Sequence, residues 1–151
     1  MNQEHRVMKI YNQILKDIMY PLLGNDLTYG NDLERIGKIF VPNFIGVFSS
    51  DLIPDLKTGE SCIVNLDTSQ QNGSHWISVL MHKNIVYVYD SFGRSSREII
   101  KSLFHKFPKQ VEIIDSDNDA EQTYEQNDCG QRSLTFIIIF NQWGKNLALL
   151  I

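Results

Sequence analysis

The chain opens with apolar residues that recur at three- and four-residue steps, from Val7 to Ile18, and Pro21 closes this stretch. The spacing predicts an amphipathic helix over about residues 3–20, ended by the proline. Near the other end, an almost unbroken apolar run over residues 134–140 follows Cys129, and Gly144 supplies a stop signal. This second pattern predicts a buried helix that begins close to Cys129.

Between these helices the pattern changes to short runs rich in β-branched residues, which are typical of strands. Residues 61–66, 75–81, 85–90 and 110–114 are predicted strands, and residues 42–48 form an extended segment. Asp32 predicts the cap of a short helix ending at Ile39 and interrupted by Gly37, and Ser95 with Glu98 predicts a capping box for a helix ending before Pro108. The expected fold class is α+β, with a small central mixed β-sheet packed against helices.

The clearest local pattern is the hairpin of residues 75–90, with a turn at Lys83 and Asn84. A two-residue turn places Ile77 opposite Asp90, so His75 and Asp90 become diagonal neighbours on one face. The other members of that face are all apolar: Ile77, Val79, Met81, Val86 and Val88. Two ionisable groups at the open end of an apolar face indicate a site rather than a solvated surface.

Composition bounds the class of protein. The 151 residues fit one domain, 1–151, and the hydrophobic share of 42% and charged share of 21% are ordinary for a globular protein. A net charge of -4 gives no support for nucleic-acid binding, although a local basic patch stays open. Two cysteines do not make a disulfide scaffold, so a reducing intracellular setting is expected. No apolar run reaches the roughly 18 residues that span a membrane, and the polar first residues do not resemble a signal peptide.

Cys129 is the first candidate for chemistry, because the positive end of a helix dipole favours a thiolate over a thiol. A lone cysteine is more often an inert buried residue, so its partners decide the interpretation. His75 could act as base and Asp90 could orient it, which gives the chain order His, Asp, Cys. An oxyanion hole would need the Cys129 N–H and an amide from the preceding loop. Gln122 and Gln126 are both available for that amide.

Two neighbours of these residues are predicted to border a substrate cleft. Trp76, beside His75, is expected to serve partly as core and partly as a wall of the site. Gly130 leaves room for another backbone or a substrate to approach Cys129 closely. No metal and no cofactor are expected, because the four histidines and two cysteines show no zinc-ligand spacing.

Three short blocks carry a family resemblance: Gly73-Ser74-His75-Trp76, Tyr89-Asp90-Ser91-Phe92-Gly93, and Asp128-Cys129-Gly130 after a glutamine-containing loop. Together they resemble the adenovirus maturation protease family (adenain) and the wider clan of SUMO-deconjugating proteases. The chain looks most like the short members from virophages, Polinton-type elements and large DNA viruses. In those members a segment like residues 44–52 precedes the histidine.

The resemblance implies a papain-like, adenain-like cysteine protease fold with a catalytic core over about residues 44–144. It makes His75 the general base, Asp90 the third triad member and Cys129 the nucleophile at the start of a buried helix. Adenain's spacing favours Gln122 as the oxyanion residue, and related viral enzymes leave Gln126 open. The chain lacks most of adenain's C-terminal region. Its acidic net charge argues against a DNA cofactor like that of adenain. No cysteine clearly matches the one that links adenain's activating peptide.

The function implied is a viral maturation cysteine endopeptidase that cuts capsid or core precursors at small-residue, Gly-containing sites, in the virion or the host-cell cytoplasm. Its partners would be those precursors, with an activating peptide left open and no membrane. One alternative keeps the triad and makes the substrate a ubiquitin-like or SUMO-type conjugate. Others are an inactive structural or binding homologue and an acyltransferase on the same fold. Gly-Gly tails fit a narrow cleft in either protease, so the sequence separates those two poorly.

Overall fold

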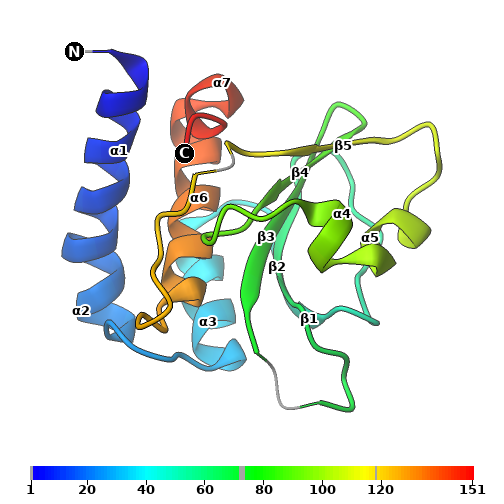
Figure 1. Ribbon diagram of the computed structural model, residues 1–151, viewed down its shortest axis with the longest axis horizontal. Coiled ribbons are helices and arrows are strands. Elements are labelled where there is room, and N and C mark those ends of the chain that lie inside the picture. Colours follow the sequence, from blue (N-terminus) through cyan, green and yellow to red (C-terminus); the bar gives the residue numbers. More distant parts are fainter. Residues whose placement is uncertain (1, 72–73, 118) are drawn as a thin grey trace.

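The computed structural model describes residues 2–71, 74–117 and 119–151 (Figure 1). The chain has an α+β fold with a five-stranded mixed sheet, as predicted. Its elements, in chain order, are α1 (Gln3–Ile14), the π-helical turn η1 (Leu15–Met19), α2 (Tyr20–Leu23), α3 (Gly30–Phe40), β1 (Phe44–Ser49), β2 (Ser61–Asn65), β3 (Trp76–His82), β4 (Ile85–Tyr89), α4 (Ser96–Ile99), α5 (Lys101–Lys106), β5 (Glu112–Asp115), α6 (Cys129–Trp143) and α7 (Lys145–Ala148).

The sheet follows the order β1-β2-β3-β4-β5, with β1–β2 and β4–β5 parallel and the two central pairings antiparallel. In the central hairpin, His82 lies opposite Ile85. This register is the predicted one. Lys83 and Asn84 both have positive φ, 50° and 64°, which matches the two-residue turn that suits a right-twisted hairpin.

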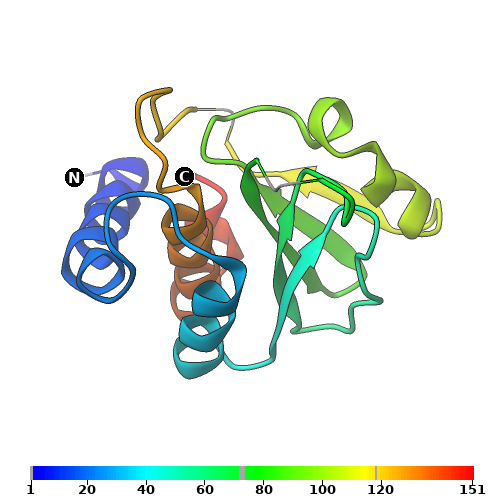
Figure 2. The same ribbon diagram turned by 90° about the horizontal axis from the view of Figure 1, so that it is seen from below.

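Helices cover both faces of the sheet (Figures 1 and 2). One face packs against α6, which α1, α3 and α7 surround, and the other packs against α4 and α5. The predicted apolar face of the hairpin lies on the α4–α5 side. The opposite face is equally buried, because Tyr87 and Tyr89 pack on Phe136 and Phe140 of α6. Strands covered on both sides become continuously apolar instead of alternating.

The N-terminal helical segment runs further than predicted. It continues without a break from α1 through η1 into α2 and ends at Leu23, not at Tyr20. Pro21 directly follows the π-helical turn η1 and Tyr20, so the helix passes the proline where its hydrogen-bond pattern is already changed. The expected stop at residue 20 was therefore wrong by about one turn.

Three smaller expectations also need correction. Asp32 lies in the first turn of α3 rather than at its cap, and Gly37 sits inside an uninterrupted helix, where a Cβ would come within 2.5 Å of the Phe44 ring. Ser95 occupies the N-cap position without a side-chain cap bond, and this helix breaks into α4 and α5 at Ile100. The short helix α7 after Gly144 was not predicted.

The helix α6 begins at Cys129, ends at Trp143 and is buried through Phe140. Two serines fasten it to β3. The Ser78 hydroxyl donates to the Ser133 carbonyl over 2.7 Å, and the Ser133 hydroxyl donates to the Trp76 carbonyl over 3.0 Å. These bonds place the first turn of α6 beside the start of β3. Among the helices of the described residues, none is long and apolar enough to cross a membrane.

Candidate active site

His75 and Asp90 form a close buried pair at the open end of the central hairpin. His75 immediately precedes β3 and Asp90 immediately follows β4, so the hairpin register brings them together. The Nε2 atom of His75 lies 2.6 Å from Oδ1 of Asp90, and both side chains are almost fully buried. Such a contact fixes the orientation of the imidazole ring and favours its protonated form.

The Asp90 carboxylate is held by more than the histidine. Arg94 donates from Nε over 2.8 Å and from its backbone N–H over 3.1 Å, and the Phe92 N–H donates over 3.3 Å. Burial alone would raise the pKa of Asp90, but the hydrogen bonds and charges of His75 and Arg94 lower it to about 2. Asp90 is therefore ionised throughout the physiological pH range.

Cys129 meets the histidine at the first residue of α6. Its Sγ atom accepts a hydrogen bond from the Trp76 N–H over 3.5 Å, and Cys129 is close enough to the His75 ring to affect the pKa of that histidine. Because Asp90 occupies Nε2, Nδ1 is the ring nitrogen that remains for a bond to the sulfur. Burial lowers the pKa of His75, yet the hydrogen bonds and charges of Asp90 and Cys129 raise it overall. The structure thus brings the three predicted residues together, with His75 bonded to Asp90 and Cys129 beside the histidine.

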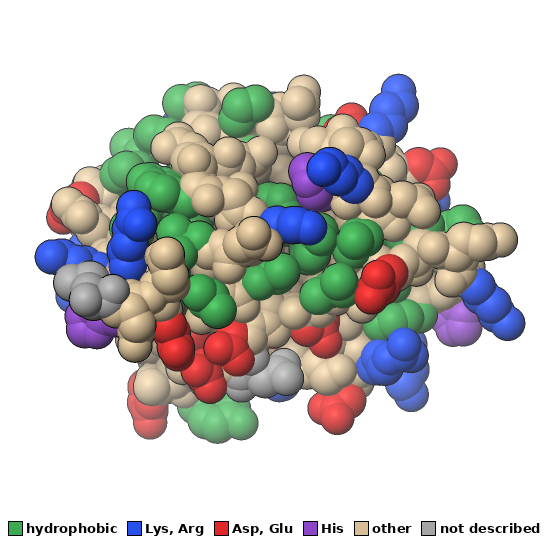
Figure 3. Space-filling view, turned by 90° about the horizontal axis from the view of Figure 1, so that it is seen from above, with side chains coloured by type: hydrophobic (Ala, Val, Ile, Leu, Met, Phe, Trp, Pro, Cys, Tyr) green, Lys and Arg blue, Asp and Glu red, His purple; other side chains and the backbone are tan. Residues whose placement is uncertain are grey.

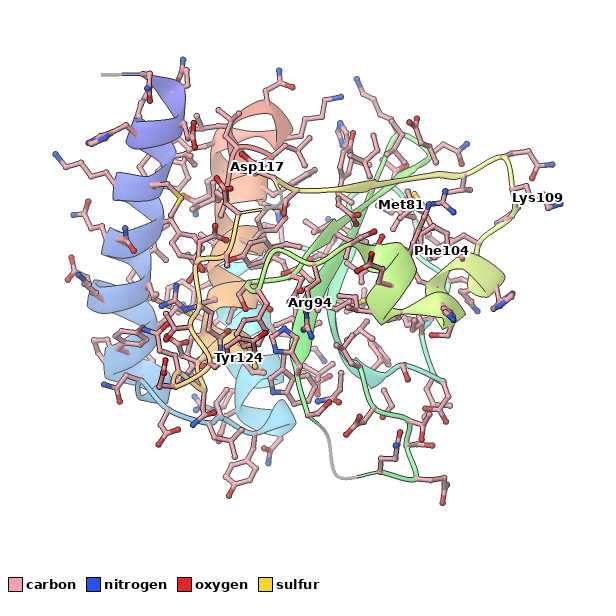
Figure 4. The ribbon with its side chains drawn as sticks, in the orientation of Figure 1. Met81, Arg94, Phe104, Lys109, Asp117 and Tyr124 are labelled. Atoms are coloured by element: carbon pink, nitrogen blue, oxygen red, sulfur yellow. The ribbon has the colours of Figure 1, made fainter. Side chains whose placement is uncertain are left out.

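Aromatic rings cover the exposed side of this group. Phe92 stacks on His75 with ring centroids 4.9 Å apart, and Tyr124 stacks on Phe92 at 5.5 Å. The Arg94 guanidinium lies over the Phe92 ring at 5.0 Å. In Figure 4, Arg94 comes from the segment after β4 and Tyr124 from the segment leading into α6. Tyr124 is 93% exposed, so this stack reaches the surface of the molecule.

The two candidate oxyanion glutamines have different surroundings. Gln122 is buried; its Oε1 accepts from the Ser91 hydroxyl at 2.6 Å and its Nε2 donates to the Gln126 carbonyl at 2.7 Å. Gln126 is exposed, and its side-chain Oε1 turns back to accept from the Thr123 N–H. Gln122 therefore has a fixed amide facing the segment before Cys129, with one N–H proton to spare. Gln126 contributes its carbonyl to hold that amide.

Trp76 lies between the site and a neighbouring pocket. Its indole contacts the α3 end at Gly30, where a Cβ would be 3.4 Å from the ring. It also lines a cavity of about 330 Å³ that continues past Val47 and Asn65. Trp76 is half-buried and packs against the hydrophobic core, and its role as a wall of the substrate site stays a prediction.

Gly130 packs closely against α3 and the segment before it. A Cβ at this position would come within 2.8 Å of both Leu33 Cδ1 and Thr28 Cγ2. The close approach that the glycine permits is thus made by α3 and the segment before it. Gly130 therefore has a packing role on this side, and its place at a substrate cleft stays a prediction.

Sequence reasoning missed two side chains that belong to this group. Arg94 pairs with Asp90 from a non-helical segment, so no helical charge spacing in the sequence pointed to it. Ser91 was not given a role, and no sequence pattern links it to Gln122. Gly73, part of the histidine motif, lies outside the described residues. Its neighbour Ser74 bonds Asp67 and not the triad.

One group of acidic side chains among the described residues is compact enough to be considered as a metal site. Glu4, Asp117 and Asp119 have carboxylate oxygens within 4.8 Å of one another, all on exposed side chains. Figure 3 shows acidic side chains gathered on one part of the face that carries the start of α1. Exposed carboxylate groups of this kind are common without a metal, and no histidine or cysteine joins them. The His75–Cys129 contact is part of no such group.

Comparison with known proteins gives no independent assignment. No model of a known protein family matches the chain, and none of the curated proteins matches it. The geometry of the site and the motif resemblance therefore carry the functional argument.

Proposed function

We propose that the chain is a cysteine endopeptidase with a papain-like, adenain-like arrangement of sheet and nucleophile helix. The observation that carries this proposal is the buried His75–Asp90 pair next to the Cys129 sulfur, which accepts from the Trp76 N–H at the N-terminus of α6. A thiol, an imidazole in contact with it and a carboxylate orienting the imidazole are the parts that nucleophilic acyl transfer needs. Both cysteines are free thiols, as a thiol nucleophile requires.

The reaction follows from these positions. His75 Nδ1 takes the proton of the Cys129 thiol, and the thiolate attacks the carbonyl carbon of the scissile amide. The Cys129 N–H and the Gln122 Nε2 group stabilise the resulting oxyanion. The amide C–N bond then breaks as His75 protonates the leaving amine. Water, deprotonated by His75, hydrolyses the thioester, and the acid leaves with the thiol restored.

The burial of the sulfur supports small residues at the cleavage site. Cys129 is only 5% exposed, and the half-buried Trp76 lies directly beside it. A glycine can bring its carbonyl to a recessed sulfur more easily than a residue with a bulky side chain. Capsid or core precursors with Gly-containing sites are the proposed substrates, and the virion or host-cell cytoplasm is the proposed location. Both rest on the resemblance of the three sequence blocks.

The test compares cleavage of candidate capsid precursors and of short peptide amides ending in Gly-Gly or Gly-Leu before the scissile bond. Cys129→Ala and His75→Ala should lose at least about a thousandfold in kcat/KM. Cys62→Ala is the matched control, since Cys62 is fully buried in β2 away from the site, and it should keep the activity. Full cleavage by Cys129→Ala would overturn the proposal. Preference for a ubiquitin-like C-terminal amide over every capsid peptide would move the substrate class to conjugates.

A further inference from the structure

Asp128, the residue before the proposed nucleophile, accepts hydrogen bonds from two side chains. The Tyr20 hydroxyl donates to its Oδ2, and Arg132 Nε donates to its Oδ1 over 2.9 Å. An aspartate at the start of a helix usually caps the free N–H groups of the first turn, but Asp128 makes no such bond. Its side chain is only 2% exposed, so these two bonds fix its position.

Fixing Asp128 also fixes the amide of Cys129. The Asp128 carbonyl accepts from the Arg132 N–H over 3.0 Å. That carbonyl and the Cys129 N–H belong to the same planar trans peptide, so they point in opposite directions. With the carbonyl directed along α6, the Cys129 N–H is directed out of the helix, where an oxyanion would form.

A series of hydrogen-bonded polar side chains connects Asp128 to Glu121 across the molecule. Its members, in order, are Asp128, Arg132, Tyr11, Tyr89 and Glu121. Arg132 Nη1 contacts the Tyr11 hydroxyl at 3.4 Å, and the Tyr11 and Tyr89 hydroxyls lie 2.8 Å apart. Tyr89 donates to Glu121 Oε1 over 2.8 Å. Burial raises the pKa of both tyrosines, so their hydroxyls keep their protons.

Each end of this series lies next to a proposed oxyanion donor. Asp128 directly precedes Cys129, and Glu121 directly precedes Gln122. Tyr11, in the middle of the series, comes from α1, and Tyr20 comes from α2. The N-terminal helical segment therefore bonds Asp128 directly through Tyr20 and is linked to Glu121 through the Tyr11–Tyr89 contact, although it carries none of the proposed catalytic residues.

We infer that Tyr20, Tyr11 and Arg132 are positioning residues that hold the Cys129 N–H and the Gln122 amide at a set separation for the oxyanion. The inference rests on the proposed function, and it makes residues 3–23 part of the working site rather than a packing helix alone. It assigns no contact with substrate to these residues. Misplacement of an oxyanion donor lowers the rate of acyl transfer but leaves direct attack of the thiol on an alkylating agent unchanged.

The test uses the full chain with Tyr20→Phe and Tyr11→Phe, each removing one hydroxyl, and Asp128→Asn, which keeps the shape of the side chain. Tyr29→Phe is the matched control, because Tyr29 is 70% exposed and bonds no described residue through its hydroxyl. Four quantities are measured: kcat, KM, the inhibition constant of a Gly-Gly peptide aldehyde, and the rate of Cys129 alkylation by iodoacetamide. Melting temperature is recorded so that every assay is run on folded protein.

We expect Tyr20→Phe and Tyr11→Phe to lose about tenfold in kcat and in aldehyde affinity, with KM and alkylation rate within twofold of wild type. The aldehyde reports the oxyanion site because its adduct carries that oxygen. Parallel losses in alkylation and kcat would overturn the inference in favour of a structural role. If the wild-type chain cleaves amides, unchanged kcat and aldehyde affinity in Tyr20→Phe and Tyr11→Phe would also overturn the inference. If the wild-type chain cleaves no amide, the proposed function and this inference fail together.

Discussion

The backbone N–H of Trp76 donates to the Sγ atom of Cys129 across 3.5 Å. Trp76 directly follows His75, so one dipeptide gives the sulfur both an imidazole neighbour and an N–H donor. The same peptide segment is fastened to α6 through Ser133, which keeps the dipeptide and the thiol in register.

The protonation of His75 should respond in opposite directions to its two neighbours. Asp90→Asn removes the negative charge that helps to raise the pKa of His75, so that pKa should fall. Arg94→Met removes the cation that competes for Asp90, so the pKa should rise. An NMR titration of the four histidines measures both shifts, with His105 as an internal control on α5. Shifts of the same sign in the two variants would contradict the arrangement.

The two glutamines should separate in kinetics. Gln122→Ala should lower kcat by about a hundredfold, the usual cost of removing one oxyanion donor. Gln126→Ala should change kcat by less than threefold, because only its backbone carbonyl holds Gln122. Ser91→Ala should fall between them, since it frees the Gln122 amide without removing it. A larger loss for Gln126→Ala than for Gln122→Ala would exchange their roles.

Gly130→Ala tests the close packing of Gly130 against Leu33 and Thr28. The added methyl must displace Leu33 or Thr28, so the free energy of unfolding should fall by about 1–3 kcal/mol. Urea unfolding measures this change, and kcat/KM is measured on the fraction that stays folded. Normal stability together with a large rise in KM would place Gly130 at the substrate cleft.

Glu121 should make stability depend on pH. Burial raises the pKa of its carboxyl to about 7, with the Tyr89 bond and Arg132 acting against that rise. Between about pH 4.5 and 7 the unfolded chain is ionised at this position while the folded chain keeps its proton, so stability falls as pH rises. Above pH 7 the loss is complete.

Glu121→Gln removes this loss. The variant should gain roughly 1–3 kcal/mol over wild type between pH 5 and pH 8, measured by urea unfolding at both values. Glu125→Gln, an exposed neighbour on the same segment, is the matched control and should show no such gain. An equal difference between Glu121→Gln and wild type at the two pH values would rule out the buried proton.

The hairpin was predictable because a two-residue turn and an alternating apolar face fix its register, and His75 and Asp90 follow from that register. The helix α6 was predictable because its apolar run follows Cys129 and a glycine marks its end. The filling of the space beside Gly130 was not, because Leu33 lies about a hundred residues away in the chain. The contact of Tyr20 with Asp128 spans a similar separation. Single-sequence patterns report local spacing, and such pairings depend on how the helices dock.

The most direct test of the central claim is alkylation of Cys129 by iodoacetamide from pH 5 to pH 8, followed by intact mass. The Cys62→Ala background leaves a single thiol, and the comparison is with His75→Ala in that background. At pH 6 the thiol should react at least tenfold faster than an ordinary cysteine, whose pKa is about 8.5, and His75→Ala should lose that rate. Reaction that rises only toward pH 8.5, with or without His75, would contradict an assembled Asp90–His75–Cys129 site.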